Sequence, residues 1–172
     1  MSEQENKSAV MDEQMIALAQ QVFQLVREGD TNQLAGVLEK GFPANLRNDK
    51  GDSLLMLASY NGHYDSTALL LQYGADPELL NDRQQSPLAG VAFKGDRKIA
   101  ELLINQGADV NRKTPDGKTA LMFAAMFNQV DVVDLLIAKG ADIDAVTDEG
   151  KTAMMLAEAM GASDSIKRLS VA

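Results

Sequence analysis

Apolar and polar positions recur along the chain with a period of 33 residues. Residues 114–146 show the pattern most clearly, as a polar tract, an apolar run, a short break, a second apolar run and a Gly-Ala-Asp loop. One period earlier, Leu103 stands at the position of Leu136, and Gly107 stands at the position of Gly140. Such self-similarity predicts a stack of equivalent units, each of which buries its apolar face against its neighbours.

The outer units are weaker or shorter than the inner ones, which predicts that they cap the stack. In this frame the units are residues 15–47, 48–80, 81–113, 114–146 and 147–172. Residues 9–27 carry apolar side chains mostly at helical spacing, so the first helix of the N-terminal cap is expected to extend upstream. A helix that docks on a partner is the alternative. Residues 1–8 are largely polar and predict a disordered tail, so the repeat domain is expected to span residues 9–172.

Glycine, replaced once by asparagine, punctuates the units at two positions. Both residue types adopt the left-handed backbone conformation with little steric strain and often end helices. The residues expected to end a first helix are Gly29, Gly62, Gly95, Asn128 and Gly161, and those expected to end a second helix are Gly41, Gly74, Gly107 and Gly140. Hydroxyl residues stand before the apolar runs, as N-caps do, at Ser53, Ser86, Thr119 and Thr152. Each unit is therefore predicted as turn, helix, turn, helix and loop.

These features together resemble the ankyrin repeat. The motifs that carry the resemblance are Asp-Gly-Lys-Thr-Ala-Leu at residues 116–121 and Gly-Ala-Asp at residues 140–142, with Ser-Pro-Leu at residues 86–88 and Gly-Ala-Asp-Val-Asn at residues 107–111. The resemblance covers roughly residues 15–172 and implies an all-α solenoid of stacked helix-turn-helix units with β-turn tips. The family's usual histidine in the first helix is replaced here by Met56, Ala89, Met122 and Met155.

Columns of equivalent residues predict the core. The first column is Val22, Leu55, Leu88, Leu121 and Met154; the second is Leu25, Ala58, Val91, Ala124 and Ala157; the third is Val37, Leu70, Leu103, Leu136 and Leu169. The second column is mostly small, which predicts close packing of neighbouring first helices, whereas the longer third column is expected to fill the space between second helices. Gln84 stands where the equivalent turns have glycine, so a positive φ at this position would strain the backbone.

Composition and charge narrow the classes of function. The chain has 172 residues, of which 45% are apolar, and it has no cysteine, which excludes disulfides and thiol nucleophiles. It has no apolar run as long as a membrane helix, which needs roughly 18 residues, and no recognisable signal peptide, so a cytoplasmic protein without a membrane partner is expected. We also expect the protein to be a monomer. The net charge of −9 argues against nucleic-acid partners.

Unit 81–113 differs from the rest in charge, with a net charge of +2. Its basic residues are Arg83, Lys94, Arg97, Lys98, Arg112 and Lys113. This basic island is either a patch for an acidic partner or ordinary variation on a solvated surface.

Catalytic and metal sites find little support in the sequence. The lone histidine, His63, follows Gly62 at the start of a second helix, where a structural role at the helix-helix turn is expected. The acidic tract around Asp142 and Asp144 fails as a calcium loop, because Val146 occupies the fifth position, where an oxygen ligand is needed. We therefore expect no enzyme, no cofactor, no metal and no small-molecule ligand.

The resemblance implies that protein partners bind in a concave groove lined by the turn tips and the exposed ends of the first helices. The tip positions are Asp49, Lys50, Asp52, Arg83, Gln85, Asp116, Lys118, Asp148, Glu149 and Lys151, and the helix-end positions are Tyr60, Asn61, Phe93, Lys94, Met126, Phe127 and Met160. Tyr60, Phe93 and Met126 are equivalent, and exposed rows of large apolar side chains mark binding surfaces. The alternative is that these side chains fold under the neighbouring turn and serve the core.

Two functions fit these expectations. The first is a protein-interaction module, or scaffold, whose groove binds one protein or an exposed peptide. The second is an inhibitor or immunity-type regulator that blocks a co-produced enzyme or toxin, with the acidic tips supplying the fit. The residues at the tips do not identify the partner.

Overall fold

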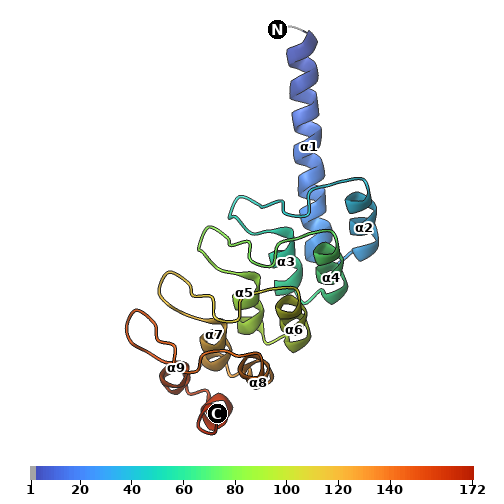
Figure 1. The fold of residues 1–172 in the computed structure, drawn as a ribbon. Helices are drawn as coiled ribbons and strands as arrows, with labels where there is room; N and C mark the ends of the chain where they lie inside the picture. The colour runs from blue at the N-terminus through green and yellow to red at the C-terminus, as the bar shows by residue number, and fades with distance from the viewer. Residues whose placement is uncertain (1–2) are drawn as a thin grey trace.

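The computed structural model describes the backbone of residues 3–172 and the side chains of residues 12–172. Within this range the chain is an all-α stack of helix pairs, and a finger-like loop projects beside the first helix of most pairs (Figure 1). The helices are α1 (Glu3–Glu28), α2 (Thr31–Glu39), α3 (Leu54–Tyr60), α4 (Tyr64–Gln72), α5 (Pro87–Lys94), α6 (Arg97–Asn105), α7 (Ala120–Met126), α8 (Val130–Ala138), α9 (Ala153–Met160) and α10 (Ser163–Leu169). The predicted helical solenoid is confirmed.

Helix α1 is much longer than the other helices and extends beyond the stack, as predicted (Figure 1). It begins at Glu3, so the segment 1–8, for which a disordered tail is expected, is helical from that residue onward; residues 1–2 lie outside the described part of the chain. No glycine or proline interrupts the sequence between Glu3 and Glu28, and such a sequence lets a helix propagate.

The first helices start at the predicted hydroxyl caps. The hydroxyl oxygens of Ser53 and Ser86 accept hydrogen bonds from the backbone N–H of Met56 and Ala89, at 3.1 and 3.2 Å. Thr119 and Thr152 cap α7 and α9 in the same way. These bonds satisfy an amide that has no partner within the helix, so each sequence signal fixes a helix start.

The helix ends also follow the prediction. Every glycine assigned to a helix end has a positive φ, and Asn128 takes the same conformation, with φ 57°. Gln84 has φ 59°, so the turn that lacks glycine still adopts the left-handed backbone of its neighbours. The strain expected at this residue therefore has a structural basis.

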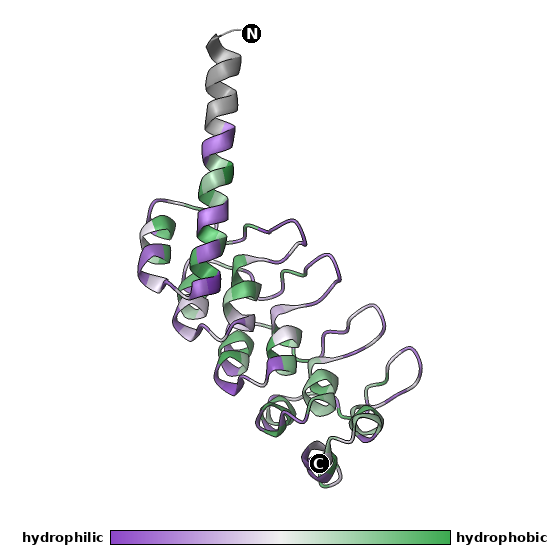
Figure 2. Ribbon diagram, turned by 180° about the vertical axis from the view of Figure 1, so that it is seen from behind, coloured by the Kyte–Doolittle hydropathy of each residue, from purple (hydrophilic) through white to green (hydrophobic). Residues whose placement is uncertain are grey.

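The predicted columns form one continuous core along the stack. Figure 2 shows that hydrophobic residues gather in the helices, whereas the projecting loops are largely hydrophilic. The second column is buried in every unit, and the first and third columns are buried in the three central units. Val37, Met154 and Leu169 are only half-buried, because they lie in the outer units, which have a neighbouring unit on one side only. The apolar face of each inner unit is thus covered from both sides.

Polar side chains link the loops that follow the second helices. Asn45 donates from Nδ2 to the Gly74 carbonyl at 3.1 Å, and its Oδ1 accepts from the Asp76 N–H at 2.8 Å. Asn111 makes the same pair of bonds two junctions further along the stack. At the junction between them, Glu78 takes the place of asparagine and accepts from the Asp109 N–H at 2.9 Å. Each loop is thereby held to the next.

Two further properties of the described residues concern membrane-spanning helices and metal ligands. None of the helices between residues 3 and 172 has both the length and the hydropathy needed to cross a membrane. Among the side chains of residues 12–172, no group of three or more histidine, aspartate or glutamate residues is arranged to hold a metal ion.

Candidate functional site

The projecting loops, called fingers here, are tight turns at residues 48–52, 81–85, 114–118 and 147–151, and they are built from local hydrogen bonds. In the first finger, the Asn48 N–H donates to the Asp52 carbonyl at 2.9 Å, and the Gly51 N–H donates to the Asn48 carbonyl at 3.0 Å. The Asn48 side-chain oxygen accepts from the N–H groups of Lys50 and Asp52, both at 2.9 Å. Since asparagine, serine and threonine commonly bond to the backbone of their own turn, the start of each unit fixes its finger.

Backbone bonds join neighbouring fingers in two pairs. The Asp82 N–H donates to the Lys50 carbonyl at 3.2 Å, and the Asp148 N–H donates to the Asp116 carbonyl at 3.1 Å. Pro115 stands at the equivalent position of the finger between these two donors, and proline has no N–H to donate. The second and third fingers therefore lack this link, and among the described residues no donor reaches the Arg83 carbonyl.

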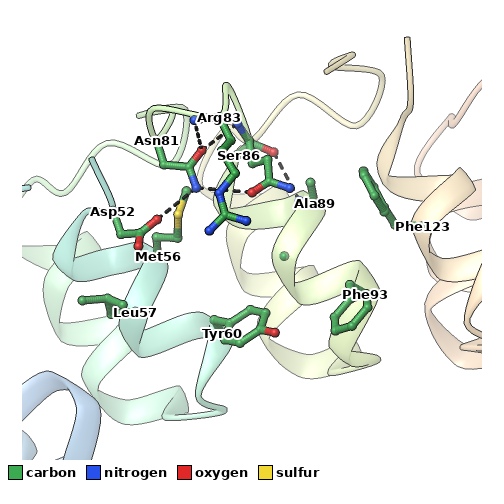
Figure 3. A pocket seen from close by; sticks show the side chains of 12 residues that line it. Asp52, Met56, Leu57, Tyr60, Asn81, Arg83, Ser86, Ala89, Phe93 and Phe123 are labelled. Carbon is green, nitrogen blue, oxygen red and sulfur yellow. Dashed lines mark hydrogen bonds between the residues drawn. The ribbon is translucent and has the colours of Figure 1, made fainter. Parts of the chain in front are cut away.

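A hollow of about 440 Å³, named here the central hollow, lies beneath the second finger and over α3 and α5, with its edge at α7 (Figure 3). The residues predicted for binding that line it are Asp52, Tyr60, Arg83, Gln85 and Phe93. The other residues that line it are Met56, Leu57, Asn81, Ser86, Ala89, Gly90 and Phe123. The hollow thus spans three successive units and has an apolar floor with polar groups on the finger side.

Three aromatic rings form a continuous row beside the central hollow. The rings of Tyr60 and Phe93 are stacked, with centroids 6.4 Å apart and an interplanar angle of 10°. The Phe127 ring packs edge-on against Phe93, with centroids 4.4 Å apart. Tyr60 and Phe93 line the hollow and Phe127 continues the row outside it. Tyr60 and Phe127 remain about 40% exposed, so the row is not simply part of the core.

Gly90 makes room for this row. A Cβ atom at this position would lie 3.3 Å from Cδ2 of Tyr60, which is tighter than an ordinary van der Waals contact. In the next unit the equivalent residue is Phe123, whose half-buried ring forms the far wall of the hollow. The alternation of a small and a large side chain at one position therefore shapes the hollow.

Polar contacts on the finger side hold Asp52 and Asn81 together. Nδ2 of Asn81 donates to Oδ1 of Asp52 at 2.9 Å, and the Asn81 side-chain oxygen accepts from the backbone N–H groups of Arg83 and Gln85, both at 3.0 Å. The guanidinium of Arg83 makes no ion pair within the described part of the chain. Figure 3 shows it extending from the finger over the hollow, between Met56 and Ala89.

The later fingers carry ion pairs of their own. Lys118 pairs with Asp116, and this contact, together with the Thr114 hydroxyl, holds the pKa of the Asp116 carboxyl below its ordinary value. Lys151 pairs with Glu149 at 2.7 Å and lowers the pKa of that exposed carboxyl in the same way. These fingers present compensated charges at the surface.

A second hollow, named here the flanking hollow, adjoins the central hollow through Tyr60, which lines both. It lies at the ends of α3 and α5, and the predicted residues Tyr60, Asn61 and Lys94 line it. The Lys94 ammonium lies 5.0 Å from the centroid of the Tyr60 ring, in a cation–π contact. The two hollows together make a path from the second finger to the turn after α5.

The remaining predicted positions lie outside both hollows. They are Asp49, Lys50, Asp116, Lys118, Met126, Phe127, Asp148, Glu149, Lys151 and Met160. Met126 packs partly buried against the core, as the alternative for the aromatic and methionine positions expects, whereas Met160 is 52% exposed. The structure therefore brings together most candidates of units 48–80 and 81–113, and of the later units it adds only Phe127, through its contact with Phe93.

The sequence reasoning missed the inner face of the first helices, namely Met56, Leu57, Ala89, Gly90 and Phe123. A signal was present, because Leu57, Gly90, Phe123 and Leu156 occupy one position of the repeat with very different sizes. A position that must fit the same core in each unit would vary less in volume. Size variation down a column can therefore mark a surface hollow.

Two comparisons with known proteins both point to ankyrin repeats. A family model for ankyrin repeats, which comprises three copies, matches residues 22–114 and 88–170. A protein of Pseudomonas aeruginosa that carries the name "Putative ankyrin repeat protein" is 57% identical to this chain over 49 residues. The aligned part makes up 28% of this chain and 29% of that relative, so the chain matches less than a third of the relative's length.

Proposed function

Since the chain belongs to the ankyrin repeat family, a non-catalytic fold for protein–protein interaction, we propose that it binds an extended segment of a partner protein in the central hollow. The hollow crosses first helices of three successive units, so a segment that lies along it contacts each unit in turn. The second finger bounds the hollow on one side, and Tyr60 and Phe93 bound it on the other (Figure 3).

The observation that carries this proposal is the row of Tyr60, Phe93 and Phe127. Aromatic side chains supply much of the binding energy at protein interfaces, because each buries a wide apolar area and loses few rotamers. Two of these rings keep about 40% of their surface exposed in the free protein. A partner that covers this apolar surface removes it from water, which stabilises the complex. A solvated helix end needs no such side chains.

The test combines partner capture with a matched pair of variants. The full chain is used to capture a partner, the bound segment is mapped with peptides, and the affinity of that peptide is measured by fluorescence anisotropy. We expect the variant Tyr60→Ala/Phe93→Ala/Phe127→Ala to bind at least about 100-fold more weakly, since hot-spot residues commonly cost more than 1 kcal/mol each.

The control variant is Tyr64→Ala/Tyr73→Ala, which removes two rings of similar exposure, 45% and 40%, from α4 and its C-terminal end, outside the central hollow. Its affinity is expected to equal that of the wild type. Both variants must still unfold cooperatively in urea, which shows that the stack is intact. Wild-type affinity in the triple variant would place the binding surface elsewhere.

A further inference from the structure

Four basic side chains of unit 81–113 follow the path of the two hollows. Arg83 lines the central hollow, and Lys94, Arg97 and Lys98 line the flanking hollow. All four residues are exposed, and none of them forms an ion pair with a carboxylate within residues 12–172. Arg97 donates to a backbone carbonyl, that of Asp131, at 2.9 Å.

Basic residues of the neighbouring fingers are engaged differently. Lys118 and Lys151 each pair with a carboxylate of their own finger, and Arg47 pairs with Asp82 at 3.0 Å. In the central hollow, by contrast, the guanidinium donors of Arg83 face an apolar floor (Figure 3). Within residues 12–172, the side chains of Arg83 and Lys94 thus form neither an ion pair nor a hydrogen bond, so their donors are available to contact a ligand.

The carboxylates of the two hollows are Asp52, Asp96 and Asp131. Asp52 already accepts a hydrogen bond from the Asn81 amide at 2.9 Å, and Asp96 caps α6 by accepting from the Ile99 N–H at 3.0 Å. Two of the three carboxylates thus serve internal contacts. The protein's net charge of −9 acts weakly at this place, because salt screens exposed charges beyond roughly 8–10 Å.

We propose that the segment bound in the central hollow is acidic: a large apolar side chain fills the hollow against Tyr60 and Phe93, and flanking aspartate or glutamate side chains pair with Arg83 and Lys94. This inference rests on the proposed function and specifies its partner. Arg83 lines the central hollow from the finger, whereas Lys94 lines the flanking hollow at the end of α5, and Tyr60 is shared by both hollows. Carboxylates that pair with both cations are therefore expected on both sides of the apolar residue. Arginine and carboxylate can form paired hydrogen bonds, which adds geometric specificity to the attraction.

The experiment selects ligands without assuming a natural partner. A phage-displayed library of random 12-residue peptides is selected on the immobilised full chain and on the variant Arg83→Glu/Lys94→Glu. We expect the wild type to enrich aspartate and glutamate on both sides of a leucine, phenylalanine or tryptophan. The variant is expected to lose this acidic enrichment while keeping the apolar one.

One selected peptide then serves as the probe for affinity measurements. Replacing its acidic residues by asparagine or glutamine is expected to weaken binding to the wild type at least tenfold, and raising the NaCl concentration from 0.05 to 0.5 M is expected to weaken it similarly. The matched control is Lys40→Glu/Lys167→Glu, which makes the same change in net charge at exposed residues outside both hollows. This control is expected to bind like the wild type.

The outcomes separate this inference from the proposed function. Enrichment of apolar residues without acidic ones overturns the inference and leaves the groove as the binding site. Peptides that bind the Tyr60→Ala/Phe93→Ala/Phe127→Ala variant as well as the wild type overturn both. Tight binding of a labelled 12-nucleotide oligouridine to the wild type, lost in Arg83→Glu/Lys94→Glu, would show that Arg83 and Lys94 bind nucleic acid. The inference would then fail.

Discussion

The imidazole Nε2 of His63 lies 2.8 Å from the backbone carbonyl oxygen of Arg27, in the preceding unit. One period of the repeat separates His63 from Asp96 and two periods separate it from Gln129, whose Nε2 donates to the Phe93 carbonyl at 3.1 Å. Histidine and glutamine thus make the same link between units. His63 therefore has a structural role at the helix-helix turn, as its position in the sequence indicates.

We predict that His63→Gln keeps the stability of the wild type and that His63→Ala lowers the free energy of unfolding by about 0.5–1.5 kcal/mol, the usual net value of one hydrogen bond. Glutamine can reach the Arg27 carbonyl as Gln129 reaches its own acceptor, whereas alanine leaves that carbonyl to water. Urea unfolding of the three proteins at pH 7 measures the difference. Equal losses in both variants would show that the bond contributes nothing.

Leu103→Ala tests the core. Leu103 is fully buried in α6, at the centre of the stack, so its truncation opens a cavity between second helices. We expect a loss of about 2–5 kcal/mol in the free energy of unfolding. Leu102→Ala, at the adjacent half-buried residue of the same helix, provides the control and is expected to cost clearly less. A loss below about 0.5 kcal/mol for Leu103→Ala would contradict the assigned packing.

Gln84→Gly is expected to stabilise the protein by about 0.5–1 kcal/mol, because glycine adopts φ 59° without strain. The Gln84 side chain is exposed, and its backbone bond from N–H to the Asn81 carbonyl survives the change. The melting temperature and urea midpoint of the variant should both rise. An unchanged midpoint would mean that the turn holds glutamine without strain.

Asn128→Gly provides the contrasting case. Asn128 shares the positive φ of Gln84, but its side-chain oxygen accepts from the backbone N–H groups of Asp164 and Ser165, at 3.1 and 2.9 Å. These groups belong to the first turn of α10, whose own N-cap residue, Ala162, supplies no side-chain bond. The glycine variant therefore loses a helix cap and is expected to be destabilised by about 0.5–2 kcal/mol.

The sequence predicted those features that depend on one residue and its immediate neighbours. The caps at Ser53 and Thr119, the positive φ at Gln84 and the buried column through Leu103 all follow from local backbone and packing rules that act alike in every unit. Repetition strengthened each prediction, because an assignment in one unit had to hold in the next.

The site was harder to predict because it depends on differences between units. The central hollow requires Gly90 beside Phe123, and Arg83 and Lys94 make no ion pair within the described residues because no carboxylate there lies within reach of them. Glu78 illustrates the same limit: it replaces an asparagine of the repeat and takes over its bond to the next loop. Such pairings depend on side-chain conformations across two units, which the repeat pattern does not specify.

The ion pair of Lys118 and Asp116 makes a small part of the stability depend on pH. The lowered pKa of Asp116 in the folded protein means that the folded state favours the ionised carboxylate more than the unfolded state does. This contribution is fully present above the ordinary pKa of 3.8 and is lost as the pH falls through the lowered value. Because the Asp116 side chain is 58% exposed, solvent screening limits the contribution to about 0.2–1 kcal/mol.

We therefore expect Asp116→Asn to lower the free energy of unfolding slightly at pH 7 and to match the wild type more closely at pH 3, below the ordinary pKa of 3.8, where the ionised carboxylate contributes less to stability. Urea unfolding at both pH values measures the two differences, and 0.5 M NaCl at pH 7 should shrink the first of them. In a Lys118→Met background the effect of Asp116→Asn at pH 7 should fall, because the main cause of the lowered pKa is gone. A loss of equal size at both pH values, unchanged by Lys118→Met, would show instead that ionisation of Asp116 does not stabilise the folded state.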